Sequence, residues 1–165
     1  MEKHEIRLRK MSEEDFSRFR EYSISDYAET MFKAGNIDKK KALIEAEGEF
    51  NKLLDNGLHT PNQFLMVIED INKGTDIGWI WYMYEEDDSC KKAFVCDFLI
   101  FEEERRKGYA TEALRELERM VKEDERSLIA LYVWEQNVPA SNLYKKCGYE
   151  IADNQDDGAY MIKQL

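Results

Sequence analysis

In the first third of the chain, a short segment alternates between apolar and polar positions, and after it the apolar residues recur at helical spacing. Ile6 and Leu8 share one face of residues 5–9, which predicts a short first strand. Ser12 precedes three acidic residues, as is typical of a helix start, so we expect a helix to about residue 22 and a second helical piece over residues 25–33. A longer helix is predicted over residues 37–54, where apolar residues recur at helical spacing: Leu43, Ala46, Phe50, Leu53 and Leu54.

The period then changes to that of strands. Residues 63–69, 77–84 and 93–101 are rich in β-branched and aromatic residues and are separated by short turns, which predicts an antiparallel meander. After it, a helix over residues 110–121, an apolar strand over 128–134, a helix over 140–147 and two closing strands over 149–152 and 160–163 are predicted. The pattern indicates a mixed α+β fold.

The turn after the third strand of the meander has the composition of a phosphate-binding loop. It reads Arg105-Arg106-Lys107-Gly108-Tyr109-Ala110-Thr111 and leads directly into an amphipathic helix. Free backbone N–H groups and the positive end of the helix dipole converge at such a helix start. A phosphate-bearing cofactor is therefore the first hypothesis. A Rossmann site would need further glycines in this loop, and a P-loop would need Gly-Lys-Ser/Thr, so neither fits.

Composition and charge narrow the class of protein. The length of 165 residues and the 43% hydrophobic content fit one globular domain spanning residues 1–165. The start of the chain is polar and no apolar run is long enough for a membrane span, so we expect a cytoplasmic protein without a membrane partner. A net charge of −11 opposes binding to nucleic acid and favours a cationic acceptor, unless it serves solubility alone.

Few residues are available for metal or thiol chemistry. The three cysteines, Cys90, Cys96 and Cys147, lack metal-ligand spacing, and we expect reduced thiols and no metal site. The two histidines, His4 and His59, lie away from the segments that carry chemistry. A histidine-dependent triad is therefore not expected.

A second segment supports the first and points to a family. Residues 137–149 follow the strand at 128–134 and have the form N-x-x-A-x-x-L-Y-x-x-x-G-aromatic, while residues 105–110 have the form R-x-x-G-x-A. Together, in this order, they resemble the GNAT N-acetyltransferase superfamily over about residues 93–150. The resemblance implies a mainly antiparallel central sheet flanked by helices on both faces, and an enzyme that uses acetyl-CoA as co-substrate, as a monomer or homodimer.

The resemblance also implies roles for individual residues. Backbone groups of Phe98, Leu99 and Ile100 would pair with the pantetheine arm of the coenzyme. Amides of Arg106, Lys107, Gly108, Tyr109, Ala110 and Thr111 would surround the pyrophosphate, with Arg105 flanking them; Ala110 stands where the family often has glycine. Asn137 would bond the pantetheine arm or cap its helix. Tyr144 would protonate the departing thiolate.

The general base and the acceptor are open. Asp97 is a carboxylate within an apolar strand, which suggests either a base or a partner for a nearby arginine, and ordered water could serve as the base instead. The acceptor is expected to be a primary amine of a small molecule or peptide, bound between the N-terminal helices and the aromatic strand, among Tyr22, Asp26, Tyr27, Glu29, Trp79, Trp81 and Tyr84. The acidic run at residues 85–88 would help to attract it. The alternative is a non-catalytic acyl-CoA-binding or protein-interaction module on the same fold.

Overall fold

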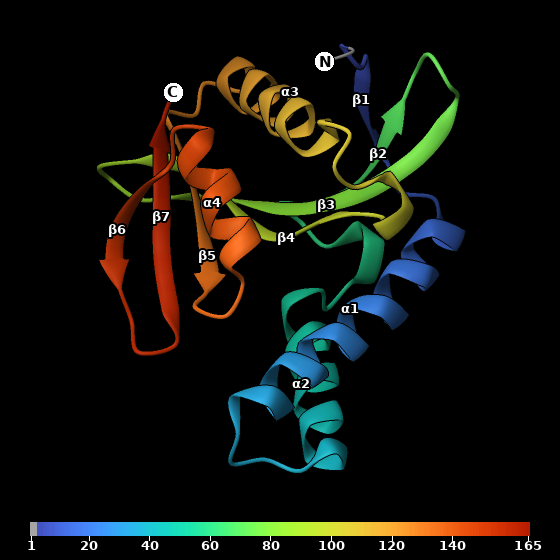
Figure 1. Ribbon diagram of the computed structural model, residues 1–165, viewed down its shortest axis with the longest axis vertical. Coiled ribbons are helices and arrows are strands. Elements are labelled where there is room, and N and C mark those ends of the chain that lie inside the picture. Colours follow the sequence, from blue (N-terminus) through green and yellow to red (C-terminus); the bar gives the residue numbers. More distant parts are fainter. Residues whose placement is uncertain (1–2) are drawn as a thin grey trace. The chain divides into compact units, whose positions relative to one another are not determined.

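A computed structural model describes residues 3–165 (Figure 1). The elements in chain order are β1 (Ile6–Lys10), α1 (Glu13–Ala34), α2 (Lys39–Leu53), a 3₁₀ turn (Gly57–His59), β2 (Gln63–Asp70), β3 (Thr75–Glu86), β4 (Lys91–Ile100), a second 3₁₀ turn (Glu102–Glu104), α3 (Tyr109–Glu123), β5 (Leu128–Trp134), α4 (Val138–Lys146), β6 (Glu150–Asn154) and β7 (Gly158–Gln164). The mixed architecture, with a mostly antiparallel sheet, is as predicted. Among the described residues, no helix combines the length and apolarity that crossing a membrane requires.

The chain forms two compact units. One holds the segment up to Lys10 and the stretch Phe64–Leu165, and the other holds Met11–Gln63. The interpretation of residues 1–165 as one domain stays a prediction.

The unit Met11–Gln63 is a pair of helices with side-chain caps. The hydroxyl of Ser12 accepts the backbone N–H of Asp15 and the Asp15 carboxylate accepts that of Ser12, so α1 begins with a full capping box. The expected break near residue 23 is wrong, because Ile24 and Ala28 continue the buried stripe begun by Phe19 and α1 runs on to Ala34.

The predicted apolar stripe of α2 is partly wrong as well. Ala42, Ala46 and Phe50 form its buried face, while Leu43 and Leu53 are 48% and 43% exposed. The helix begins at Lys39, two residues later than predicted, and the side chain of Asp38 caps it by accepting the backbone N–H of Lys41.

The other unit is a seven-stranded sheet in the order β1-β2-β3-β4-β5-β7-β6. β1 pairs antiparallel with β2, β3 with β4, and β7 with both β5 and β6, whereas β4 and β5 are parallel. A parallel pair needs a crossover, and α3 supplies it.

Helices α3 and α4 share one core with this sheet. Leu114 and Leu117 of α3 are fully buried, and truncating either to alanine would cost about 2–5 kcal/mol. The amino group of Lys163, on β7, donates to Glu118 of α3 and to the carbonyl of Cys147 after α4, at 3.0 and 2.8 Å. This lysine holds the two helices to the same strand.

Candidate functional site

The two parallel strands begin as partners and then separate. Pairing of β4 with β5 ends at Val95 and Leu131, whereas β4 continues alongside β3 as far as Ile100 and β5 continues alongside β7 (Figure 1). After Val95, therefore, β5 no longer covers its edge of β4. Such an edge presents backbone N–H and C=O groups that an extended ligand can pair with. The predicted coenzyme residues Phe98, Leu99 and Ile100 lie on this stretch.

A β-bulge lies where the separation starts. Trp81 faces Asp97 and the next residue, Tyr82, faces Val95, so Cys96 is an extra residue in β4. A bulge bends its strand and increases the local twist, which turns the remainder of β4 away from β5. Burial, together with the negative charges of Asp97 and Glu85, raises the pKa of the Cys96 thiol to about 12. Cys96 is therefore protonated at neutral pH and is a poor nucleophile.

The loop that follows β4 ends in a left-handed turn at the start of α3. Gly108 has φ 87° and Arg106 has φ 63°. No side chain caps the first turn of α3, whereas the side chains of Ser12, Asp38 and Asn137 cap the other three helices of the described chain. Its first backbone N–H groups thus lack the side-chain acceptor that the other helices have. An anion is the natural partner for them.

Two basic residues of the loop have internal partners. The Nε of Arg105 donates to the carbonyl of Ile100 at 2.9 Å, and the amino group of Lys107 lies 2.9 Å from the carboxylate of Glu104. Arg105 thus ties the loop to the end of β4. The backbone amides and the exposed Arg106 are the groups that the loop presents.

A buried polar cluster of Tyr109 and Asp70 lies next to this loop. The hydroxyl of Tyr109, the first residue of α3, donates to Asp70 at 2.6 Å, and Asp70 is 1% exposed. Burial alone would raise the pKa of Asp70, but hydrogen bonds from Tyr109 and from the amides of Lys73 and Asn72, with the charge of Lys73, lower it below its usual value.

His4 belongs to the same cluster. Its Nε2 lies 2.7 Å from the carbonyl oxygen of Lys107, its Nδ1 lies 3.7 Å from Asp70, and its ring centroid is 4.0 Å from that of Tyr109. The expectation that both histidines lie away from the segments that carry chemistry is therefore wrong for His4. No sequence signal could have found it, because 103 residues separate it from Lys107.

The second predicted segment places Tyr144 on α4. Its side chain is buried, with its ring 5.6 Å from the Tyr149 ring in an edge contact. Burial, followed by the negative charges of Asp97 and Cys147, raises the pKa of Tyr144. The structure thus brings Tyr144 within electrostatic reach of Asp97, which is half-buried on β4.

Asn137 is a helix cap. Its side-chain oxygen accepts the backbone N–H of Ala140 at 3.3 Å, with Pro139 in the first turn of α4. The capping alternative for Asn137 is therefore confirmed. Contact with a pantetheine arm stays a prediction.

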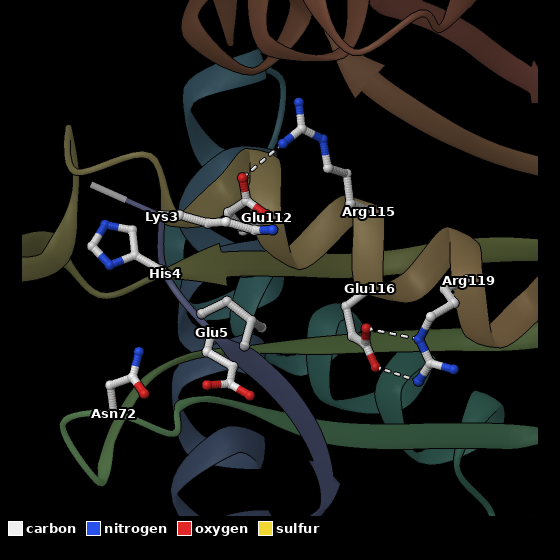
Figure 2. A pocket seen from close by; sticks show the side chains of 9 residues that line it. Lys3, His4, Glu5, Asn72, Glu112, Arg115, Glu116 and Arg119 are labelled. Atoms are coloured by element: carbon white, nitrogen blue, oxygen red, sulfur yellow. Dashed lines mark hydrogen bonds and ion pairs between the residues drawn. The ribbon is translucent and has the colours of Figure 1, made fainter. Parts of the chain in front are cut away.

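A hollow of about 540 Å³ lies along α3 and is lined by no residue of β4 or β5. Figure 2 shows it between the N-terminal segment, Asn72 and the outer face of α3, with His4 at one edge. Arg115 pairs with Glu112 and Arg119 with Glu116, at 2.7 and 2.6 Å. The charges on its α3 wall are thus paired with each other, which makes it a weaker ligand site than the separated strands.

The acidic run at the β3–β4 turn is less available than expected. Glu85 pairs with Lys92 at 3.4 Å and Glu86 with Arg126 at 3.5 Å. The Asp87 carboxylate accepts three hydrogen bonds, from the hydroxyl and amide of Ser89 and the amide of Cys90. Two of the four carboxylates in this run are thus paired with cations, and a third is hydrogen-bonded within the turn.

Comparison with known proteins shows which family this chain matches. Residues 5–150 match the family model described as the acetyltransferase (GNAT) domain. The chain is 32% identical over 148 residues to YycN of Bacillus subtilis (strain 168), an uncharacterized N-acetyltransferase. The aligned residues cover 90% of this chain and 94% of YycN. The crystal structure of YycN, a putative acetyltransferase, superposes with a TM-score of 0.86 at 31% identity, over 92% of this chain and 96% of that one.

More distant structures share the fold. The PaiA N-acetyltransferase of Thermoplasma acidophilum, solved in complex with coenzyme A, has a TM-score of 0.72 at 21% identity, covering 98% of this chain and 99% of PaiA. The spermidine N-acetyltransferase of Vibrio cholerae, solved with CoA and spermine, has a TM-score of 0.68 at 19% identity, over 96% and 95% of the two chains.

Proposed function

Because the chain belongs to the GNAT acetyltransferase family and is an acyltransferase, we propose that it moves an acetyl group from acetyl-CoA to the primary amine of a small molecule or peptide. The amine attacks the thioester directly. One observation carries the proposal: the edge of β4 that β5 leaves uncovered is followed, after the loop over residues 101–108, by the uncapped start of α3. These two features offer donors for an extended arm and for a pyrophosphate.

The residues present fit acetyl-CoA. Phe98, Leu99 and Ile100 offer strand backbone to the pantetheine arm, as in the addition of a strand to a sheet edge. The amides from Arg106 to Thr111 surround a helix start that favours negative charge. Ala110 is only half-buried and lies inside α3, where its φ is negative, so it fits where the family often has glycine.

The chemistry requires one bond to form and one to break. The neutral amine nitrogen attacks the thioester carbonyl carbon, a C–N bond forms, and the C–S bond breaks to release a thiolate. Tyr144 donates its phenolic proton to that sulfur, and its raised pKa keeps it protonated at neutral pH. The amine loses its proton to Asp97 or to ordered water. The proton taken from the amine then returns to the Tyr144 anion, which restores the phenol.

Polyamines are the first acceptors to test. The protein carries a net charge of −11, which raises the local concentration of organic cations. The Vibrio cholerae enzyme with the same fold was solved with spermine. Spermidine, spermine, a lysine-containing peptide and neutral amines would therefore form the panel.

The test has two steps. Titration calorimetry with CoA measures binding, and a thiol-release assay with acetyl-CoA and the amine panel measures transfer. We expect CoA to bind and at least one amine to release thiol above the hydrolysis rate, with the acetylated amine seen by mass spectrometry. CoA binding without transfer to any amine would instead favour a non-catalytic acyl-CoA-binding module.

A further inference from the structure

The contact between His4 and the loop before α3 fixes a peptide plane. The carbonyl of Lys107 and the N–H of Gly108 belong to one peptide unit, and in a trans peptide they point in opposite directions. No peptide bond in the described chain is cis. Because His4 holds the carbonyl at 2.7 Å, the Gly108 amide is turned to the opposite side.

The imidazole itself is held on two further sides. Its ring lies against Tyr109, 4.0 Å between centroids, and its Nδ1 faces the Asp70 carboxylate at 3.7 Å. The side chain of His4 is 8% exposed and that of Asp70 is 2% exposed. Asp70 is held in turn by the Tyr109 hydroxyl and by the amide of Lys73 at 3.1 Å. The ring has little freedom to move away from the loop.

The hydrogen-bond partner of Nε2 decides that this nitrogen carries a hydrogen. A carbonyl oxygen can only accept, so Nε2 carries a hydrogen and donates it to Lys107. The ring therefore acts as a rigid donor between the end of β2 and the loop. The side chain of a flexible residue would lose more entropy in the same contact.

We propose that His4 is a positioning residue of the cofactor loop, which holds the peptide between Lys107 and Gly108 so that the Gly108 amide faces the phosphate side. This inference rests on the proposed binding of CoA at this loop. His4 touches neither the acetyl group nor the amine. It acts on the affinity for the phosphate-bearing part of the coenzyme alone.

The test compares two replacements of His4 that both carry a side-chain amide, Gln and Asn. His4→Gln places an amide N–H near the position of Nε2, whereas His4→Asn is shorter and places it near Nδ1. We expect His4→Asn and His4→Leu to weaken CoA binding about three- to tenfold, as for the loss of one hydrogen bond, and His4→Gln to restore most of it. His59→Leu is the matched control, since His59 is 74% exposed and lies on the other unit.

A second ligand separates positioning from general damage. S-acetylpantetheine lacks the pyrophosphate, so its KM should be the same in the wild type and in His4→Asn. In the free protein, hydrogen exchange at the amides of residues 107–110 should be faster in His4→Asn than in the wild type. The Tm of the two proteins should be equal, which shows that the difference is local.

The outcomes are distinct. Wild-type protein that fails to bind CoA would overturn the proposed function. Wild-type binding with equal CoA affinity in His4→Asn and His4→Gln, or an equal loss for S-acetylpantetheine, would overturn the role of His4 alone.

Discussion

Helices α3 and α4 both follow a strand of the separated pair, yet their first turns are built differently. The first turn of α3 starts at a left-handed glycine and has no side-chain cap, while α4 starts at Asn137, whose side chain accepts the Ala140 amide. The free amides of α3 are suited to an anion. The amides of α4 are partly satisfied within the protein, so α4 serves to place Tyr144. The start of α3 is thus open to an anion, whereas the start of α4 is closed by its own cap.

The largest effect should come from the side chain that α4 places. Tyr144→Phe removes the proposed proton donor and keeps the ring, so turnover should fall about ten- to a thousandfold while CoA affinity stays nearly unchanged. Single-turnover kinetics and calorimetry measure the two quantities. Tyr149→Phe, on the neighbouring buried ring, is the control and should change turnover little. Equal turnover of Tyr144→Phe and wild type in the chemical step would make Tyr144 a packing residue.

At the start of α3 the effect should fall on binding. Gly108→Glu forces a side chain into a left-handed conformation and adds a negative charge at the helix start, so CoA affinity should drop about 30- to 100-fold. Gly108→Ala has the same backbone strain without the charge and should lose about tenfold. Calorimetry that finds unchanged affinity in Gly108→Glu would place the pyrophosphate elsewhere.

Below α3, the buried Asp70 should make stability depend on pH. Its pKa is lowered in the folded protein, so its contribution is present above the unfolded value of about 3.9 and is lost as pH falls through the folded value. Asp70→Asn should lower the free energy of unfolding by about 1–3 kcal/mol at pH 7. Urea unfolding should show this difference shrinking below about pH 4. A difference that is constant from pH 7 to pH 3 would contradict the assignment.

The cap of α4 should have a smaller, structural effect. Asn137→Ala should cost about 1 kcal/mol of stability, and Asn137→Ser, which retains a capping oxygen, should cost less. Thermal and urea unfolding measure the loss. If Asn137 also contacts the pantetheine arm, both variants weaken CoA binding; if it is only a cap, calorimetry finds CoA affinity unchanged in the serine variant.

The smallest effect concerns the acceptor rather than either helix start. A cationic amine should show a KM that rises about two- to fivefold as salt screens the protein's charge, while the KM of the anionic coenzyme should not rise. The effect is modest because Glu85 and Glu86 already pair with Lys92 and Arg126. A KM for the amine that is flat from low to high salt would assign the acidic surface to solubility.

Local sequence was enough to predict most elements and both candidate segments. Residues 105–111 lie in one loop and helix start, and residues 137–149 span helix α4 with its cap and the turn that follows it, so spacing along the chain reports their geometry directly. The closing strands and the meander were predicted for the same reason, since alternation and turns are local properties. The prediction of a break in α1 was wrong, because a buried stripe extends across the expected break and such a stripe depends on packing.

The sequence by itself determined where the helix start at Gly108, the cap at Asn137 and the central strand lie, because each is specified by neighbours in the chain. The chemical roles of their residues stay a prediction. Only the tertiary structure decided that β4 and β5 separate at the Cys96 bulge, since strand pairing joins residues far apart in sequence. It also decided that His4 and Asp70 support the loop at Lys107 and Tyr109. A histidine near the start of a chain carries no local signal of its partner; packing alone brings the two together.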